Sequence, residues 1–303
     1  MGESTRPKHK HHQASAAYAA ILVVPFLFHQ TASAATPPVG AEPAPVTNSV
    51  SVPPETTSIS TAPVGGEGVE LTARFTQDSM NYAQGIDWQI KTSFGELVYS
   101  STGGVADVKL QPGAYELLAS YGNVSIDETL NLPEQTRIAI NFVLNAGALR
   151  VLPRLKGVDG VALPTTIQIF AINGRDNGKL VATSHQPGEI LRLASGHYRV
   201  QTSFEGGNIA AITDTEVKPG ILRALDIDHH GGIVHLSVTN GNAATTWAIH
   251  DDNGALVTPP AGAETELALK PGHYIAEANL GTKVLRKEIR VAEGQVADIA
   301  LED

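Results

Sequence analysis

The residues best suited to chemistry gather in one stretch in the second half of the chain. They are Asp226, Asp228, His229 and His230, with His235 and His250 further along. Imidazole and carboxylate groups together suit Zn²⁺, Cu²⁺ or Ni²⁺. The spacing matches no established ligand pattern, and Gly231-Gly232 is typical of a connector between domains. The simpler interpretation is a polar linker; Asp228, His229, His230 and His235 remain candidate metal ligands, and we assign no cofactor.

Other patterns that carry catalysis are missing from the sequence. It contains no Gly-x-Ser-x-Gly elbow, Walker-type loop, dinucleotide-binding glycine motif or His-Glu-x-x-His. The Asp228-His229-His230 triplet resembles a phosphoesterase motif, but the further carboxylates and α/β context of such enzymes are absent. Residues 251–254 lack the alternating Asp ligands and terminal Glu of a calcium loop and predict a turn. We therefore expect no enzyme, although scattered carboxylates could still form a site.

The strands that position these residues are indicated by a six-residue motif that occurs three times. It reads Leu110-Gln111-Pro112-Gly113-Ala114-Tyr115, Leu193-Ala194-Ser195-Gly196-His197-Tyr198 and Leu269-Lys270-Pro271-Gly272-His273-Tyr274. Leu ends one strand, Gly permits the tight turn, and Tyr begins the returning strand. The tyrosines lie 83 and 76 residues apart, a spacing that suits small β-sandwich repeats. His197 and His273 precede the tyrosines and should face solvent, because neighbours on a strand point to opposite sides.

The flanking segments alternate apolar and polar residues, as half-buried strands do. Trp88 and Trp247 each precede their hairpin tyrosine by 27 residues, whereas Ile167 precedes its tyrosine by 31. We expect these three side chains at equivalent core positions, and a four-residue insertion in the Asn/Gly-rich segment 173–178. The prediction is an all-β chain of three tandem small antiparallel β-sandwich domains, at residues 67–145, 146–230 and 231–303.

Two segments precede these repeats. Residues 1–35 combine basic residues, a short apolar run and small residues, which is the order of a secretory signal peptide. An uncleaved membrane anchor is the alternative, although the run is short of a bilayer span and Pro25 interrupts it. Residues 36–66 are rich in Pro, Ser and Thr without Lys or Arg, and predict a disordered linker.

Charge and cysteine content restrict the partners. Without residues 1–35 the chain carries 18 basic and 30 acidic residues, a net charge of −12. This balance argues against nucleic acid and anionic membrane as partners, and we expect no membrane insertion after signal cleavage. The absence of cysteine excludes disulfides, thiolate catalysis and Cys-ligated metals. In an exported chain it favours a bacterial envelope protein, periplasmic or extracellular.

The Leu-x-Pro-Gly-x-Tyr hairpin, the preceding Trp-x-Ile strand and the turn at Val291-Ala292-Glu293-Gly294 resemble immunoglobulin-like or prealbumin-like repeats of bacterial envelope proteins. Carboxypeptidase-regulatory-like, collagen-adhesin-B-like and PEGA repeats look similar. The resemblance implies spacers, adhesive stalks or binding appendages. It also implies a Lys–Asn cross-link in some members, but the opening strands here lack Lys.

These observations predict a non-catalytic exported protein that is a binding, structural or adhesive element of the envelope. Its partner would be a protein or glycan that the sequence does not identify. The alternative is a periplasmic metal-handling or enzyme-accessory protein that uses the region from His229 to His250.

Overall fold

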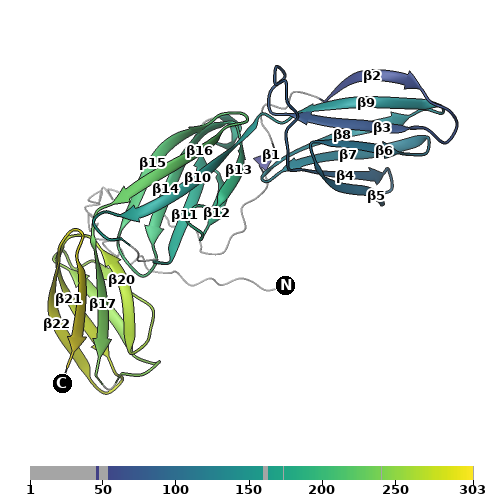
Figure 1. The fold of residues 1–303 in the computed structure, drawn as a ribbon. Helices are drawn as coiled ribbons and strands as arrows, with labels where there is room; N and C mark the ends of the chain where they lie inside the picture. Colours follow the sequence, from purple (N-terminus) through teal and green to yellow (C-terminus); the bar gives the residue numbers. More distant parts are fainter. Residues whose placement is uncertain (1–45, 48–53, 160–162, 173, 240, 303) are drawn as a thin grey trace, which may run out of the picture. The chain divides into compact units, whose positions relative to one another are not determined.

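The computed structural model describes residues 46–47, 54–159, 163–172, 174–239 and 241–302, so the expected signal peptide lies outside the described residues. The regular elements of the described chain are strands, apart from one short 3₁₀ turn, and they form three sandwich modules (Figure 1). The first contains β1 (Val46–Thr47), β2 (Glu55–Thr61), β3 (Gly68–Arg74), β4 (Ile86–Thr92), β5 (Leu97–Gly103), β6 (Val105–Lys109), β7 (Gly113–Tyr121), β8 (Val124–Leu132) and β9 (Thr136–Val143). The second contains β10 (Ala146–Leu155), β11 (Thr165–Ala171), the 3₁₀ turn η1 (Gly174–Asp176), β12 (Leu180–Ser184), β13 (Ile190–Ala194), β14 (Gly196–Phe204), β15 (Ala210–Val217) and β16 (Leu222–His229). The third contains β17 (Gly232–Val238), β18 (Thr246–Asp251), β19 (Leu256–Val257), β20 (Glu264–Leu269), β21 (Gly272–Asn279), β22 (Val284–Val291) and β23 (Val296–Leu301).

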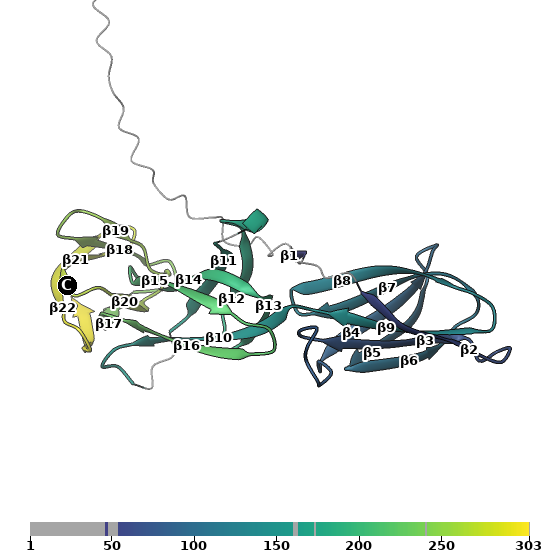
Figure 2. The ribbon, with the colours of Figure 1, turned by 90° about the horizontal axis from the view of Figure 1, so that it is seen from above.

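Each module stacks two sheets, visible as separate layers in Figures 1 and 2. The second module has the orders β13-β10-β16 and β12-β11-β14-β15, and the third repeats them as β20-β17-β23 and β19-β18-β21-β22. The first module has β2-β9-β3-β6 and β1-β8-β7-β4-β5. Most neighbours are antiparallel, which confirms the predicted fold class. The last strand of each module pairs parallel with an earlier one: β9 with β3, β16 with β10, and β23 with β17. In the first module β1 also pairs parallel with β8.

The repeated tyrosine motif forms the same turn in all three modules, but the expectation of a hairpin was wrong. The strands on its two sides, β6 and β7, β13 and β14, and β20 and β21, lie in different sheets, so the turn carries the chain from one sheet to the other. Each tyrosine hydroxyl donates a hydrogen bond to the carbonyl oxygen four residues earlier. The acceptors are Gln111 for Tyr115 (2.8 Å), Ala194 for Tyr198 (2.7 Å) and Lys270 for Tyr274 (2.8 Å). Burial raises the pKa of Tyr198 to about 12, with a smaller effect from Asp176. The bond fixes the tyrosine ring across the turn, so the strand before the turn and the strand after it are held in the same relative geometry in all three modules.

The predicted core residues are buried as expected. Trp88, Ile167 and Trp247 expose 2% of their surface or less. Both indole N–H groups donate to a carbonyl fifteen residues later, Gly103 for Trp88 and Gly262 for Trp247. Such matched bonds show that the first and third modules use one packing scheme. The 3₁₀ turn η1 lies between β11 and β12 of the second module, where the four-residue insertion was predicted.

The predicted linker differs from its expectation of disorder over part of its length. Within residues 36–66, β1 pairs parallel with β8, and β2 pairs antiparallel with β9. All seven residues of β2 are exposed, so the strand contributes main-chain hydrogen bonds and almost no core. Composition missed it because a strand without a buried face has no apolar alternation. Among the described residues there is no helix long and apolar enough to span a membrane.

Candidate functional site

His229 lies inside the second module, on the inward side of β16. It is 2% exposed, its Nε2 lies 2.9 Å from Thr202 Oγ1, and its ring meets Phe204 edge-on at 4.9 Å between centroids. Its Nδ1 is buried and has no hydrogen-bond partner. Burial lowers the pKa of His229, opposed by the charge of Asp228 and assisted by that of His230. The imidazole is therefore a neutral core group in the folded module.

The residues beside His229 point elsewhere. Asp228 and His230 are exposed, as alternation along β16 requires. His230 Nδ1 lies 2.8 Å from Glu293 Oε1 in the third module's β22–β23 turn. This hydrogen bond is the main reason that the pKa of Glu293 lies below its ordinary value. Asp226 accepts a hydrogen bond from Arg154 on the neighbouring strand β10.

His235 lies on the outer face of the third module's three-stranded sheet, between two carboxylates. Its Nδ1 is 3.0 Å from Asp298 and its Nε2 is 3.4 Å from Glu266. Together with Glu264 these side chains line a surface hollow of about 530 Å³. Since the carboxylates approach opposite nitrogens of one ring, a single ion cannot be ligated by all three groups.

The structure thus separates the candidate ligands predicted from the sequence. His229 points into a core, His230 pairs with Glu293, and His235 is held between acidic side chains. Among the described residues no group of three or more His, Asp or Glu side chains is arranged to hold a metal ion. His197 and His273 are exposed beside buried tyrosines, as predicted.

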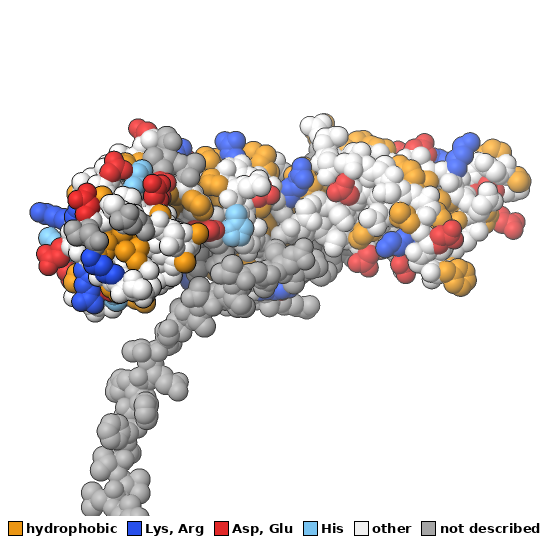
Figure 3. Space-filling view, turned by 90° about the horizontal axis from the view of Figure 1, so that it is seen from below, with side chains coloured by type: hydrophobic (Ala, Val, Ile, Leu, Met, Phe, Trp, Pro, Cys, Tyr) orange, Lys and Arg blue, Asp and Glu red, His pale blue; other side chains and the backbone are white. Residues whose placement is uncertain are grey.

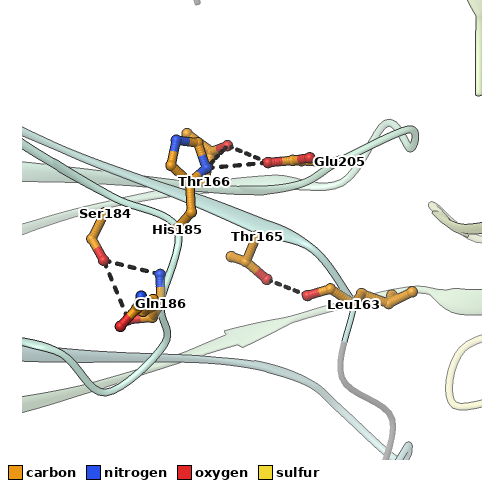
Figure 4. A network of polar contacts seen from close by, with 7 residues as sticks. All are labelled: Leu163, Thr165, Thr166, Ser184, His185, Gln186 and Glu205. Atoms are coloured by element: carbon orange, nitrogen blue, oxygen red, sulfur yellow. Dashed lines mark hydrogen bonds and ion pairs between the residues drawn. The ribbon is translucent and has the colours of Figure 1, made fainter. Parts of the chain in front are cut away.

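A polar cluster that sequence reasoning missed lies on the second module (Figure 4). His185 Nδ1 is 3.3 Å from Thr166 Oγ1 and 3.2 Å from Glu205 Oε1, and Thr166 donates to the same carboxylate. A catalytic relay needs its acid and its nucleophile on different ring nitrogens. Here both partners share Nδ1, so the cluster is a surface hydrogen-bond network.

Acidic and basic side chains are interspersed over the face shown in Figure 3.

All three modules share a parallel pairing between the last strand and an earlier one: β3 with β9, β10 with β16, and β17 with β23. This ladder joins seven residue pairs in the first module, eight in the second and six in the third. In the second and third modules the chain enters on one strand of the ladder and leaves on the other, so tension applied through the chain reaches the ladder directly. In the first module β2 precedes β3 and pairs antiparallel with β9, so tension reaches β2 first. Sequence periodicity identified the strands but contains no information on which of them are neighbours.

The comparisons agree with repeated sandwiches in general. Residues 235–302, within the third module, match a family described as the Rhizobiales growth-associated tandem repeat domain. No curated protein matches the chain. The family match agrees with a repeated module and is to none of the three particular repeat families that the tyrosine motif resembles.

Solved structures to which the chain is similar include two pilins. A Streptococcal ancillary pilin is 12% identical with a TM-score of 0.28, and the match covers 78% of this chain and 98% of the pilin. BcpA, the major pilin subunit of Bacillus cereus, is 12% identical with a TM-score of 0.23 over the same shares. The Bacillus anthracis TIE protein is 13% identical with a TM-score of 0.26; the match covers 79% of this chain but only 50% of that protein. At these identities and scores the similarity says nothing about what this chain binds.

Proposed function

We propose that the protein is a non-catalytic structural or adhesive element of the bacterial envelope, exported there, whose modules carry tension along the chain. The parallel ladder that joins the last strand of each module to β3, β10 or β17 is the observation that supports this proposal. The signal-like order of residues 1–35 supports export. The binding partner would be an envelope protein or glycan.

The mechanical argument follows from strand direction. A pull on the chain ends draws β10 from its N-terminal end and β16 from its C-terminal end. Because the two strands are parallel, these forces slide them past each other along their length. Sliding must strain all the ladder's hydrogen bonds together, whereas peeling an antiparallel hairpin breaks them one at a time. A module built in this way resists extension without any metal, disulfide or covalent cross-link.

Pulling single molecules of the full chain by their two ends tests the proposal. We expect three unfolding events, each lengthening the chain by about 250–300 Å at about 3.6 Å per extended residue. The main-chain N–H of Ala148 donates to the Ile221 carbonyl, so Ile221 faces β10. Because the main-chain groups of successive residues face alternate edges of β16, the N–H of Leu225 points toward β10 and the N–H of Ala224 points away from it. Leu225→Pro should therefore lower the force of one event, and Ala224→Pro should leave all three unchanged.

A third variant separates packing from the ladder. Leu225→Ala shortens a half-buried side chain but keeps the N–H, so its unfolding force should fall less than that of Leu225→Pro. Equal unfolding forces for the two proline variants would contradict the mechanical role of the ladder. Catalytic turnover or a saturable small-molecule site would contradict the non-catalytic assignment.

A further inference from the structure

The last strand of each module presents one edge to its parallel partner and one edge outward. In β16 the odd-numbered residues face β10, as shown by the bonds from Ala148 to the Ile221 carbonyl and from Lys156 to the His229 carbonyl. The main-chain groups of the even-numbered residues, from Leu222 to Asp228, therefore point outward. The same register places Arg137, Ala139 and Asn141 outward on β9, and Val296, Asp298 and Ala300 outward on β23. An open strand edge of this kind is a template for pairing with another strand.

Two of the three equivalent edges are protected within the chain. In the first module β2 pairs along the outer edge of β9. In the third module Lys287 on β22 reaches over the edge and donates to the Ala300 carbonyl at 2.8 Å. A lysine at an edge is a common defence against strand pairing, because its charge and length oppose an incoming strand.

The edge of β16 has neither protection. Thr213 is the counterpart of Lys287 in the second module. Thr213 pairs with Val200, two positions after Tyr198, and Lys287 pairs with Ala276, two positions after Tyr274. A threonine is too short to cover the neighbouring strand. Within the described ranges β16 pairs with β10 alone. The connectors that join the second module to its neighbours are two residues long, 144–145 and 230–231, so they cannot fold back as an extra strand.

We propose that the outer edge of β16 pairs with the same edge of a second copy of this chain. Two identical strands pair antiparallel about a twofold axis, so one available edge per chain gives a closed dimer. A register centred on Leu225 aligns the whole strand, with Leu222 opposite Asp228 and Ala224 opposite Asp226. A register centred on Asp226 would place two carboxylates directly opposite each other, which is unfavourable.

Charge on the outer face supports the register centred on Leu225. Arg150 of β10 lies beside Ala224 in the sheet, is exposed, and forms no ion pair with any described residue. In the dimer, Asp226 of the second copy lies on the other side of Ala224. The long guanidinium side chain can cross this small residue, once from each copy, and pair with that carboxylate, which also accepts a hydrogen bond from Arg154 of its own chain. The pairing also joins the two three-stranded sheets into one of six strands.

Cysteine cross-linking of the full chain tests the proposal, because the chain contains no other cysteine. Leu225 would lie opposite its own copy at a position without ladder bonds, where Cα atoms are about 4.5 Å apart and a disulfide can form. We expect Leu225→Cys to give a disulfide-linked dimer under mild oxidation at least tenfold faster than the matched variants Ile140→Cys on β9 and Ile299→Cys on β23. Equal rates for the three variants would overturn the proposal.

Two substitutions, one at Thr213 and one at Lys287, make the test independent of any effect of the introduced cysteine on folding. Thr213→Lys, added to Leu225→Cys, should slow cross-linking to the rate of the matched variants. Lys287→Thr, added to Ile299→Cys, should accelerate it. In the otherwise unaltered chain, sedimentation equilibrium should show a dimer that Ala224→Pro converts to monomer, because proline removes an outward N–H without breaking the ladder to β10. A chain that stays monomeric, or a dimer that survives Ala224→Pro and Thr213→Lys, would overturn the proposal.

Discussion

Removing the tyrosine hydroxyl from the turn between β13 and β14 should destabilise the second module by a predictable amount. Tyr198 is 4% exposed and donates to the Ala194 carbonyl at 2.7 Å, and Ala194 is itself 9% exposed. Tyr198→Phe keeps the ring and leaves this carbonyl buried without its donor. The same substitution at Tyr115 removes a bond of 2.8 Å that lies at the surface, where water replaces the hydroxyl.

The burial difference sets the magnitudes. A buried acceptor left without a partner costs about 1–3 kcal/mol, and a typical exchangeable hydrogen bond contributes about 0.5–1.5 kcal/mol. We expect a loss of about 1–2 kcal/mol in the second module for Tyr198→Phe and about 0.5 kcal/mol in the first for Tyr115→Phe. In domains of this size, each kcal/mol corresponds to a shift in melting temperature of about 4–8 °C.

Hydrogen exchange followed by mass spectrometry measures each module separately in the intact chain. The slowest amides of β14 report on Tyr198→Phe, and those of β7 report on Tyr115→Phe. If Tyr198→Phe lowers the free energy of unfolding no more than Tyr115→Phe does, the buried hydroxyl does not stabilise the turn and the reasoning fails.

Two further predictions concern the second module. Because the pKa of His229 is lowered by burial, the unfolded chain takes up this proton first as pH falls below about 6.5. The module's urea midpoint should therefore decrease from pH 7.5 to pH 5, and His229→Gln should flatten that dependence; an unchanged slope in the variant would contradict it. Gly147→Ala should cost about 1–3 kcal/mol, because a β-carbon there would lie 2.2 Å from the Lys218 carbonyl oxygen. Gly103→Ala in the first module, whose nearest contact would be 3.7 Å, is the control, and equal shifts in the urea midpoints of the two affected modules would refute the steric account.

The repeated turns and core positions were predictable because repetition removes the ambiguity of a single pattern, but the turns join two sheets and are not the hairpins that were expected. One alternating segment fits many folds, but Trp88 and Trp247 at equal distances from their tyrosines specify a shared packing scheme. The burial of His229 was also accessible: Leu225 and Ile227 precede it at a spacing of two, which places its side chain on the inward face. Its reading as linker came from the adjacent glycines.

Strand neighbours were not predictable by the same means. The pairing of β10 with β16 joins segments about seventy residues apart, and alternation shows a strand's faces but not its edges. The pairing of β2 with β9 was hidden for a related reason, because an exposed strand held by its main chain needs no particular side chains. The differing protection of the three outer edges therefore appears only once the ladders are known.

Amide hydrogen exchange of the intact chain, resolved by residue with NMR, tests the three-module account most directly. The account predicts three separate blocks of slow exchange, centred on β7, β14 and β21, with each block including the parallel ladder of its own module. Proline in one ladder, as in Leu225→Pro, should accelerate exchange in its own block and leave the first module unchanged. One continuous protected core, or rapid exchange along the parallel ladders, would contradict the account.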